Sequence, residues 1–156
     1  MTRIPYIWGF PGVFSDGETA NGVLISRTAA ALPQTATSIL FTVTGTVRLK
    51  AITGIVTTAV GNVANNTKLT HGVTDICAVT SVQNDAIGTR YSITGTFANA
   101  LVKTAVGVPV AVQATEVVLP PGNLILNCAA SDGGGGRVEW IIEYTPLTEE
   151  ARVVAV

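Results

Sequence analysis

The single histidine of the chain, His71, precedes Asp75 and Cys77 within one short segment, and these residue types can ligate a metal or form a nucleophilic site. Structural zinc needs about four ligands at recognisable pair spacings, and no second histidine or cysteine lies near this segment. A cysteine nucleophile also needs an orienting group and a cleft, which the sequence does not indicate. We therefore predict that His71 is a turn residue before Gly72, and that the chain has no catalytic, cofactor-binding or metal-binding residues.

Two further patterns contain residue types that can do chemistry. Glu139 and Glu143 share one face of a predicted strand, but they lie about 13 Å apart at the usual rise, which favours a solvated sheet face over an acid–base pair. The glycine run 133–136 leads into a strand-like segment from Arg137, whereas a phosphate-binding loop leads into a helix through Gly-Lys-Ser/Thr. We interpret the run as a mobile hairpin tip and expect that the protein is not an enzyme.

Composition limits the possible partners. Nine Lys and Arg are scattered singly and the net charge is −1, which argues against a nucleic-acid binder. No apolar run approaches the 18 or so residues of a membrane-spanning helix. Because 47% of the residues are hydrophobic and only 12% are charged, apolar patches must reach the surface, and such patches usually mark contact surfaces. We expect an obligate assembly; the alternative is a monomer kept soluble by its threonine hydroxyls.

The two cysteines, Cys77 and Cys128, lie in apolar strand-like runs and set no disulfide framework. Buried free thiols are the default, because free cysteine behaves as a small hydrophobe. A bridge between them would require neighbouring strands, which the sequence leaves open.

The first 36 residues differ from the rest in their prolines and aromatic residues. Proline fixes φ and removes a donor, so residues 4–17 cannot form a helix or a central strand. A short helix is conceivable over residues 23–32, ending at Pro33. We predict that residues 1–36 form an extended N-terminal arm, with no signal peptide, in a protein made in a cytoplasm. The expected docking anchors are its aromatic side chains, Tyr6, Trp8, Phe10 and Phe14. The alternative is an arm that folds back over its own domain.

From residue 37 onward, short β-branched runs follow one another at spacings of roughly 8–12 residues, separated by Gly, Asn, Asp and Pro. This pattern predicts an all-β domain over residues 37–156, a sandwich or barrel. The last run predicts a two-faced strand, with Val138, Trp140, Ile142 and Tyr144 on one face. The predicted strands are Ser38–Thr44, Thr46–Ile52, Ile55–Val60, Thr67–Thr70, Thr74–Val82, Thr89–Thr96, Val108–Val112, Glu116–Leu119, Asn123–Ala130 and Arg137–Tyr144.

Residues 41–47 and 91–97 resemble each other: both read aromatic, hydroxyl, β-branched, Thr, Gly, Thr, apolar. We predict that the two segments belong to opposite sheets of a sandwich. Gly45 and Gly95 would then mark a bend in each.

The segments 40–54 and 56–60 resemble small virion proteins of tailed bacteriophages, and so do 74–77, 92–96 and the closing 138–147. The resemblance covers roughly residues 38–156 and contains no catalytic motif. It implies a β-sandwich or jelly-roll subunit, often a homotrimer, that serves as a head decoration (cement) protein or another exterior virion part. The implied partners are the major capsid protein and copies of the same chain, on the outside of the phage particle.

Two other functions stay open at this point. A tail or head-fibre component would use its loop tips, residues 62–66 and 133–136, to recognise a host surface. A carbohydrate-binding jelly-roll module would need an exposed aromatic platform, and most aromatic residues after residue 37 are predicted to face inward.

Overall fold

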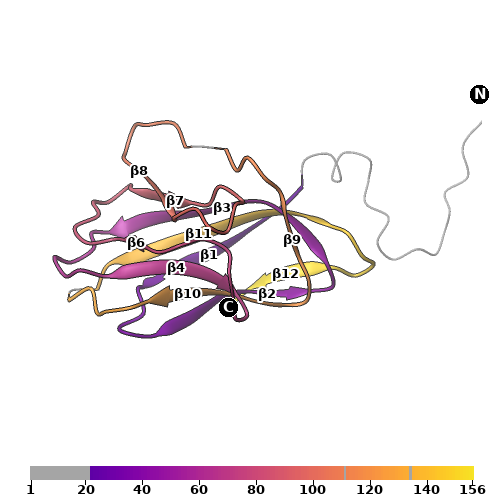
Figure 1. Ribbon diagram of the computed structural model, residues 1–156, viewed down its shortest axis with the longest axis horizontal. Coiled ribbons are helices and arrows are strands. Elements are labelled where there is room, and N and C mark those ends of the chain that lie inside the picture. The colour runs from indigo at the N-terminus through magenta and orange to yellow at the C-terminus, as the bar shows by residue number, and fades with distance from the viewer. Residues whose placement is uncertain (1–21, 111, 134) are drawn as a thin grey trace, which may run out of the picture.

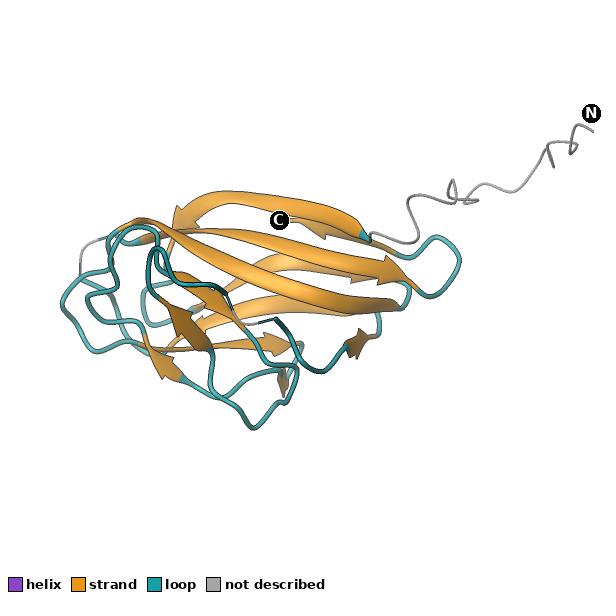
Figure 2. Cartoon of the chain, turned by 90° about the horizontal axis from the view of Figure 1, so that it is seen from above, coloured by secondary structure: helices purple, strands orange, loops and turns teal. Residues whose placement is uncertain are grey.

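The computed structural model describes residues 22–110, 112–133 and 135–156, which form two antiparallel sheets and no helix (Figures 1 and 2). In spatial order, sheet A contains β1 (Val23–Ala31), β11 (Arg137–Pro146), β3 (Val47–Thr58), β7 (Arg90–Ser92) and β8 (Val102–Thr104), with β9 (Val117–Leu119) also paired to β3. Sheet B contains β12 (Arg152–Ala155), β2 (Thr37–Thr44), β10 (Gly122–Cys128), β4 (Asn66–His71) and β5 (Thr74–Asp75), with β6 (Thr80–Ser81) paired to β4. The prediction of an all-β sandwich is confirmed.

The strand pairing is that of a jelly roll. β1 pairs with β11, β2 with β10, β3 with β7 and β4 with β5, as in one long hairpin. Rolling this hairpin up places β11 beside β3 and β10 beside β4, and the pairing shows both contacts. The two sheets therefore enclose one core between strands that are distant in sequence.

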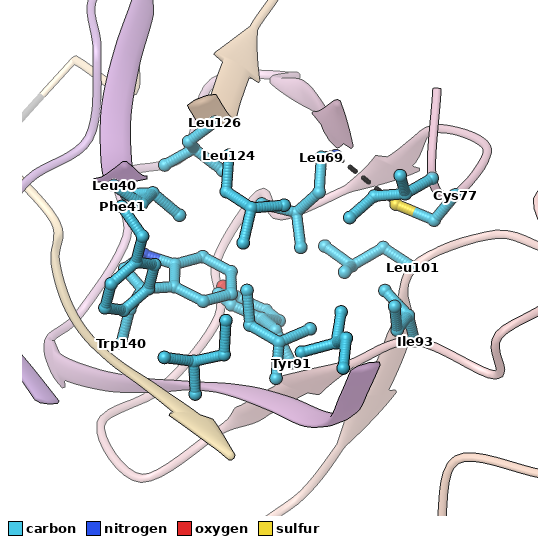
Figure 3. Packing of buried hydrophobic residues seen from close by; sticks show 14 of the residues in the cluster. Leu40, Phe41, Leu69, Cys77, Tyr91, Ile93, Leu101, Leu124, Leu126 and Trp140 are labelled. Carbon is cyan, nitrogen blue, oxygen red and sulfur yellow. Dashed lines mark hydrogen bonds between the residues drawn. The ribbon is translucent and has the colours of Figure 1, made fainter. Parts of the chain in front are cut away.

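The core is built from alternating side chains, as the period of the strands predicts. Val138, Trp140, Ile142 and Tyr144 of β11 are all buried, which confirms the predicted inward face. Trp140 packs against Tyr91 with ring centroids 6.2 Å apart, in the core that also holds leucines of sheet B such as Leu40 and Leu124 (Figure 3).

Gly54 faces the Trp140 ring, and a Cβ there would lie 2.8 Å from Trp140 Cζ3. Position 54 therefore requires glycine because the Trp140 ring lies so close, and the chain does not reverse direction there. The two strands predicted on either side of Gly54 are therefore one strand, β3.

The predicted relation between residues 41–47 and 91–97 is confirmed. Phe41 lies in β2 of sheet B and Tyr91 in β7 of sheet A. Gly45 and Gly95 both have positive φ, +67° and +88°, and a Cβ at Gly95 would overlap the Thr115 carbonyl. Both positions therefore require glycine.

The domain extends further toward the N-terminus than predicted. Residues 23–31 form neither a helix nor part of an arm, because Val23 and Ile25 pack against the core while Leu24 faces outward. Pairing with β11 overrides the helix propensity of the alanines.

Other predicted strands are also corrected. Residues 108–110 and 112, which were predicted as a strand, lie in no strand. Residues 102–104, for which no strand was predicted, form β8. The predicted strand over 74–82 is the two short strands β5 and β6, and only residues 90–92 of the segment 89–96 are a strand. β12, which no prediction covered, extends sheet B beside β2.

The sandwich has two ends. The apical end, on the left in Figure 1, carries the connections 32–36, 59–65, 82–89 and 129–136, and the 105–109 segment begins there. The basal end carries the turns 45–46, 72–73, 120–121 and 147–151. Among the described residues, no helix meets the length and hydropathy that crossing a membrane requires.

Candidate interaction surfaces

Three apical connections are joined by hydrogen bonds and side-chain contacts. The Val60 amide donates to the Asp85 carbonyl at 3.0 Å, and Gln83 Nε2 donates to Asn62 Oδ1 at 2.8 Å. A Cβ at Gly133 would lie 2.9 Å from Val63 Cγ2. The structure thus places the two loop tips singled out in the sequence, 62–66 and 133–136, side by side.

The apical end exposes aliphatic side chains from several of these connections. Val63, Ile87, Val106 and Val108 are 41%, 62%, 62% and 48% exposed. Val106 also lies against Gly88, where a Cβ would meet its Cγ2. We call these four residues the apical patch. Their distribution over three connections means that no single hydrophobic run in the sequence marks the patch, and sequence reasoning missed it.

The buried carboxylate of Asp85 anchors the connection 82–89, which also carries Ile87. Asp85 is 8% exposed and accepts hydrogen bonds from the Tyr91 hydroxyl at 2.8 Å and from Lys103 Nζ at 2.6 Å. Lys103 Nζ also donates to the Ser81 carbonyl. Burial, and then the hydrogen bond to Asp85, raise the pKa of the Tyr91 hydroxyl. Tyr91 therefore acts as a neutral donor that helps to fix Asp85.

A second buried carboxylate, Asp132, organises the glycine tip. Its Oδ2 accepts from the Gly136 amide at 2.5 Å, and its Oδ1 accepts from the Gly135 amide and from Gln34 Nε2 at 2.7 Å. Asp132 is fully buried. Gly135 and Gly136 are therefore tied to the Asp132 carboxylate, while the Gly133 amide donates to Ser131 Oγ at 3.1 Å.

The two lateral sides of the sandwich differ. On the closed side, defined by residues 78–85 and 99–104, the Ala78 amide donates to the Asn99 carbonyl at 2.8 Å and the Leu101 amide donates back to the Ala78 carbonyl at 3.0 Å. Thr80 Oγ1 donates to the Leu101 carbonyl at 2.8 Å. The two sheets are thus joined there by the backbone.

The opposite side, which we call the open seam, consists of β1, β12 and Val156. β1 and β12 are the end strands of their sheets, and no described strand pairs with their outer edges. Among the described residues, the hydrogen bonds that join β1 to sheet B come from one side chain: Arg27 Nε donates to the Val156 carbonyl at 2.6 Å and Nη2 to Ser38 Oγ at 3.5 Å.

The open seam contains a shallow groove of about 390 Å³. Small side chains form most of it, and among its described lining residues Arg27 carries the one charged side chain. The lining residues are Ser26, Arg27, Thr28, Ala29, Ala30, Ala155 and Val156. An unpaired strand edge beside a groove of small residues is a template for another extended segment.

His71, Asp75 and Cys77 each contact different residues of the domain. His71 is the last residue of β4 and directly precedes the turn at Gly72, whereas the sequence predicted that His71 itself is a turn residue. Asp75 pairs with Lys68 at 2.7 Å, and Cys77 Sγ accepts from the Leu69 amide at 3.3 Å. Within the described ranges, no group of three His, Cys, Asp or Glu is placed to hold a metal ion.

Burial lowers the pKa of His71, although its hydrogen bond to the Pro120 backbone raises it in part. Both cysteines are buried and free, as predicted, and burial raises the pKa of each thiol. Glu139 and Glu143 lie on the outer face of β11, where Glu143 is 3.7 Å from Lys50 Nζ.

The predicted arm anchors Tyr6, Trp8, Phe10 and Phe14 lie outside the described residues. Comparisons of the chain with family models, with curated proteins and with solved structures found no match.

Proposed function

We propose that this chain is a non-enzymatic structural protein of a tailed-bacteriophage virion, which decorates the assembled head and stabilises it through subunit contacts. The observation that carries the proposal is the apical patch, a group of exposed aliphatic side chains held by buried hydrogen-bonded carboxylates. A water-exposed apolar surface on a fixed frame is suited to burial against a partner. The resemblance to phage virion proteins and the jelly-roll topology favour the same function.

The mechanism is mass action. A subunit that binds the assembled shell and not its separated parts stabilises the shell by RT ln(1 + [L]/Kd), which is about 2.7 kcal/mol at a hundredfold excess over Kd. The major capsid protein and further copies of this chain, as a homotrimer, are the partners in this proposal. Tyr6, Trp8, Phe10 and Phe14 are proposed as additional anchors on the shell.

The experiment is co-sedimentation of the purified chain with heads of the phage that encodes it, prepared without the chain. We expect saturable binding, and at least tenfold weaker binding for the double variant Val63→Asp/Ile87→Asp. The matched control is Val73→Asp, because Val73 is fully exposed at the basal end. A wild-type chain that stays in the supernatant, or equal binding by the apical variant, would contradict the proposal.

A head- or tail-fibre component is the second candidate, favoured by the contact between Val63 and Gly133. Two adjacent loop tips at one end of a sandwich form a compact recognition surface. In this case the apical variant would reduce adsorption of the phage to host cells while leaving occupancy on the particle unchanged. The carbohydrate-binding alternative is less favoured, because Phe41, Tyr91, Trp140 and Tyr144 are buried.

A further inference from the structure

We propose that a pocket on the outer face of sheet A binds an uncharged amide, the group found in a peptide bond or in an Asn or Gln side chain. The pocket has a volume of about 480 Å³, which is in the range of small-molecule sites. None of the described residues that line it belongs to the apical patch, and the inference does not depend on the proposed function.

The floor of the pocket is the outer face of two paired strands, β3 and β7. Thr53 of β3 pairs with Ser92 of β7, and both residues line the pocket. Successive side chains of a strand point to opposite faces. Because Tyr91 is buried in the core between the sheets, the neighbouring Ser92 side chain points outward into the pocket.

The facing wall of the pocket consists of residues 112–116, which lead into β9. The amides of Ala114 and Thr115 both donate to the Thr94 carbonyl, at 3.1 and 3.2 Å, and β9 pairs with β3. This wall is therefore held against sheet A by backbone hydrogen bonds. A site that is already ordered loses less conformational entropy when a ligand binds.

Gln113 presents an oriented acceptor on this wall. Its Nε2 donates to the Leu49 carbonyl at 3.1 Å and to the Thr115 carbonyl at 2.9 Å. Because carbonyl oxygens only accept, these two bonds fix which end of the carboxamide is nitrogen. The other end, Oε1, is buried and has no hydrogen-bond partner among the described residues. This oxygen needs a donor from a bound molecule.

Ser92 is the second polar group without a partner in the pocket. The residue is 6% exposed, and its Oγ has no hydrogen-bond partner among the described residues. Buried polar groups are nearly always paired in folded proteins. One acceptor and one hydroxyl lining the same pocket therefore favour a ligand that both donates and accepts hydrogen bonds.

The charged side chains of the pocket favour an uncharged ligand. Lys50 Nζ lies 3.7 Å from Glu143 Oε1, and Glu116 Oε2 lies 3.4 Å from Arg48 Nε. Each charged residue that lines the described pocket thus already has a partner of opposite charge. A charged ligand would have to displace one of these partners or stay unpaired, and both cost free energy.

An amide fits these groups better than a sugar does. Its N–H can donate to Gln113 Oε1 and its carbonyl can accept from the Ser92 hydroxyl. A sugar has the same hydrogen-bonding groups, but a sugar site would need an aromatic platform. The described lining residues include no aromatic side chain, and their apolar members, such as Ile93 and Val110, are aliphatic. The ligand is therefore an amide attached to an aliphatic group.

The test is titration of the isotope-labelled full chain with N-acetyl-L-leucinamide, followed by NMR. We expect saturable shifts at residues 51–53 and 92–93 and at the side-chain amide of Gln113. Two analogues keep the aliphatic part but carry a charge: N-acetyl-L-leucine is an anion and L-leucinamide is a cation at pH 7. Both should bind at least tenfold more weakly, and so should glucose. Equal binding of the neutral and charged compounds, tighter binding of glucose, or no saturable shift with N-acetyl-L-leucinamide would overturn the inference.

A matched pair of serine variants tests the hydrogen-bonding groups. Ser92→Ala should weaken binding of N-acetyl-L-leucinamide at least tenfold without destabilising the fold, because its Oγ bonds to no described residue. The control is Ser26→Ala, an exposed serine of β1 outside this pocket, which should bind as wild type does. Wild-type affinity in Ser92→Ala would also overturn the inference. The comparison of neutral and charged compounds on the wild-type chain applies even if this variant fails to fold.

Discussion

The closed side and the open seam are the two lateral sides of one sandwich, but they are built differently. On the closed side, backbone hydrogen bonds of Ala78 with Asn99 and Leu101 join the sheets, together with the bond from Thr80 Oγ1 to the Leu101 carbonyl. Asp85 accepts from Tyr91 and Lys103 on the same side. At the open seam, a single arginine connects the two sheets within the described part of the chain. The difference shows that backbone pairing joins the two sheets on one side, whereas one side chain joins them on the other.

The largest expected effect is on the closed side. Asp85→Ala removes the acceptor of the buried Tyr91 hydroxyl and the ion-pair partner of Lys103 Nζ, which is partly exposed. We expect a loss of about 2–4 kcal/mol in the free energy of unfolding, measured by urea denaturation. Arg27→Ala at the open seam is the counterpart, with an expected loss below about 1 kcal/mol. Equal losses would remove the distinction between the two sides.

The second prediction uses pH on the same cluster. Burial and the hydrogen bond to Asp85 raise the pKa of Tyr91 in the folded state, whereas the unfolded residue ionises near its ordinary value of 10.0. The stabilisation is therefore fully present below pH 10 and is lost as the pH rises above it, by up to about 1.4 kcal/mol per pH unit. Unfolding measured between pH 8 and 11 should show this fall, and Tyr91→Phe should make it shallower. A variant that follows the wild-type profile would contradict the assignment to Tyr91.

A pair of isosteric substitutions compares the two sides directly. Thr80→Val removes the hydrogen bond from Oγ1 to the Leu101 carbonyl and should cost about 1 kcal/mol. Thr28→Val lies at the open seam on an exposed residue and should change stability by less than about 0.5 kcal/mol. Chemical denaturation of both variants under one set of conditions measures the two free energies of unfolding. The loss should be larger for Thr80→Val than for Thr28→Val.

The smallest effect on stability is expected at Leu24, an exposed residue on the outward face of β1. Leu24→Lys should leave the free energy of unfolding within about 0.5 kcal/mol of wild type, because surface substitutions rarely exceed this value. It should nevertheless lower self-association, measured by light scattering after size exclusion, because it removes an exposed apolar side chain from this face. A large loss of stability would show that Leu24 belongs to the core instead.

The sequence predicted the architecture well because alternation is a local property. The inward face of the last long strand, the opposite placement of Phe41 and Tyr91, and the free buried cysteines all follow from residue type and period. The boundary at residue 36 was wrong because Ala29 to Ala31 favour helix locally, while pairing with β11 is decided by residues more than a hundred positions away. β12 was missed for the same reason, since its strand partner in the described part of the chain is β2, more than a hundred positions away.

The candidate surfaces could be predicted only in part. The loop tips 62–66 and 133–136 were recognised from their turn residues, and their contact through Val63 and Gly133 required the structure. The roles of Asp85 and Asp132 could not be read from the sequence, because their hydrogen-bond partners come from other segments of the chain. The anchors of the predicted arm stay a prediction.

The most direct test of the account is the thermal stability of assembled heads at increasing concentrations of this chain. If the protein acts by binding a completed shell, the temperature at which heads come apart rises with concentration and levels off when a fixed number of copies per head is bound. The Val63→Asp/Ile87→Asp variant should need at least tenfold more protein for the same rise. A disassembly temperature that is independent of the chain at every concentration would contradict the account.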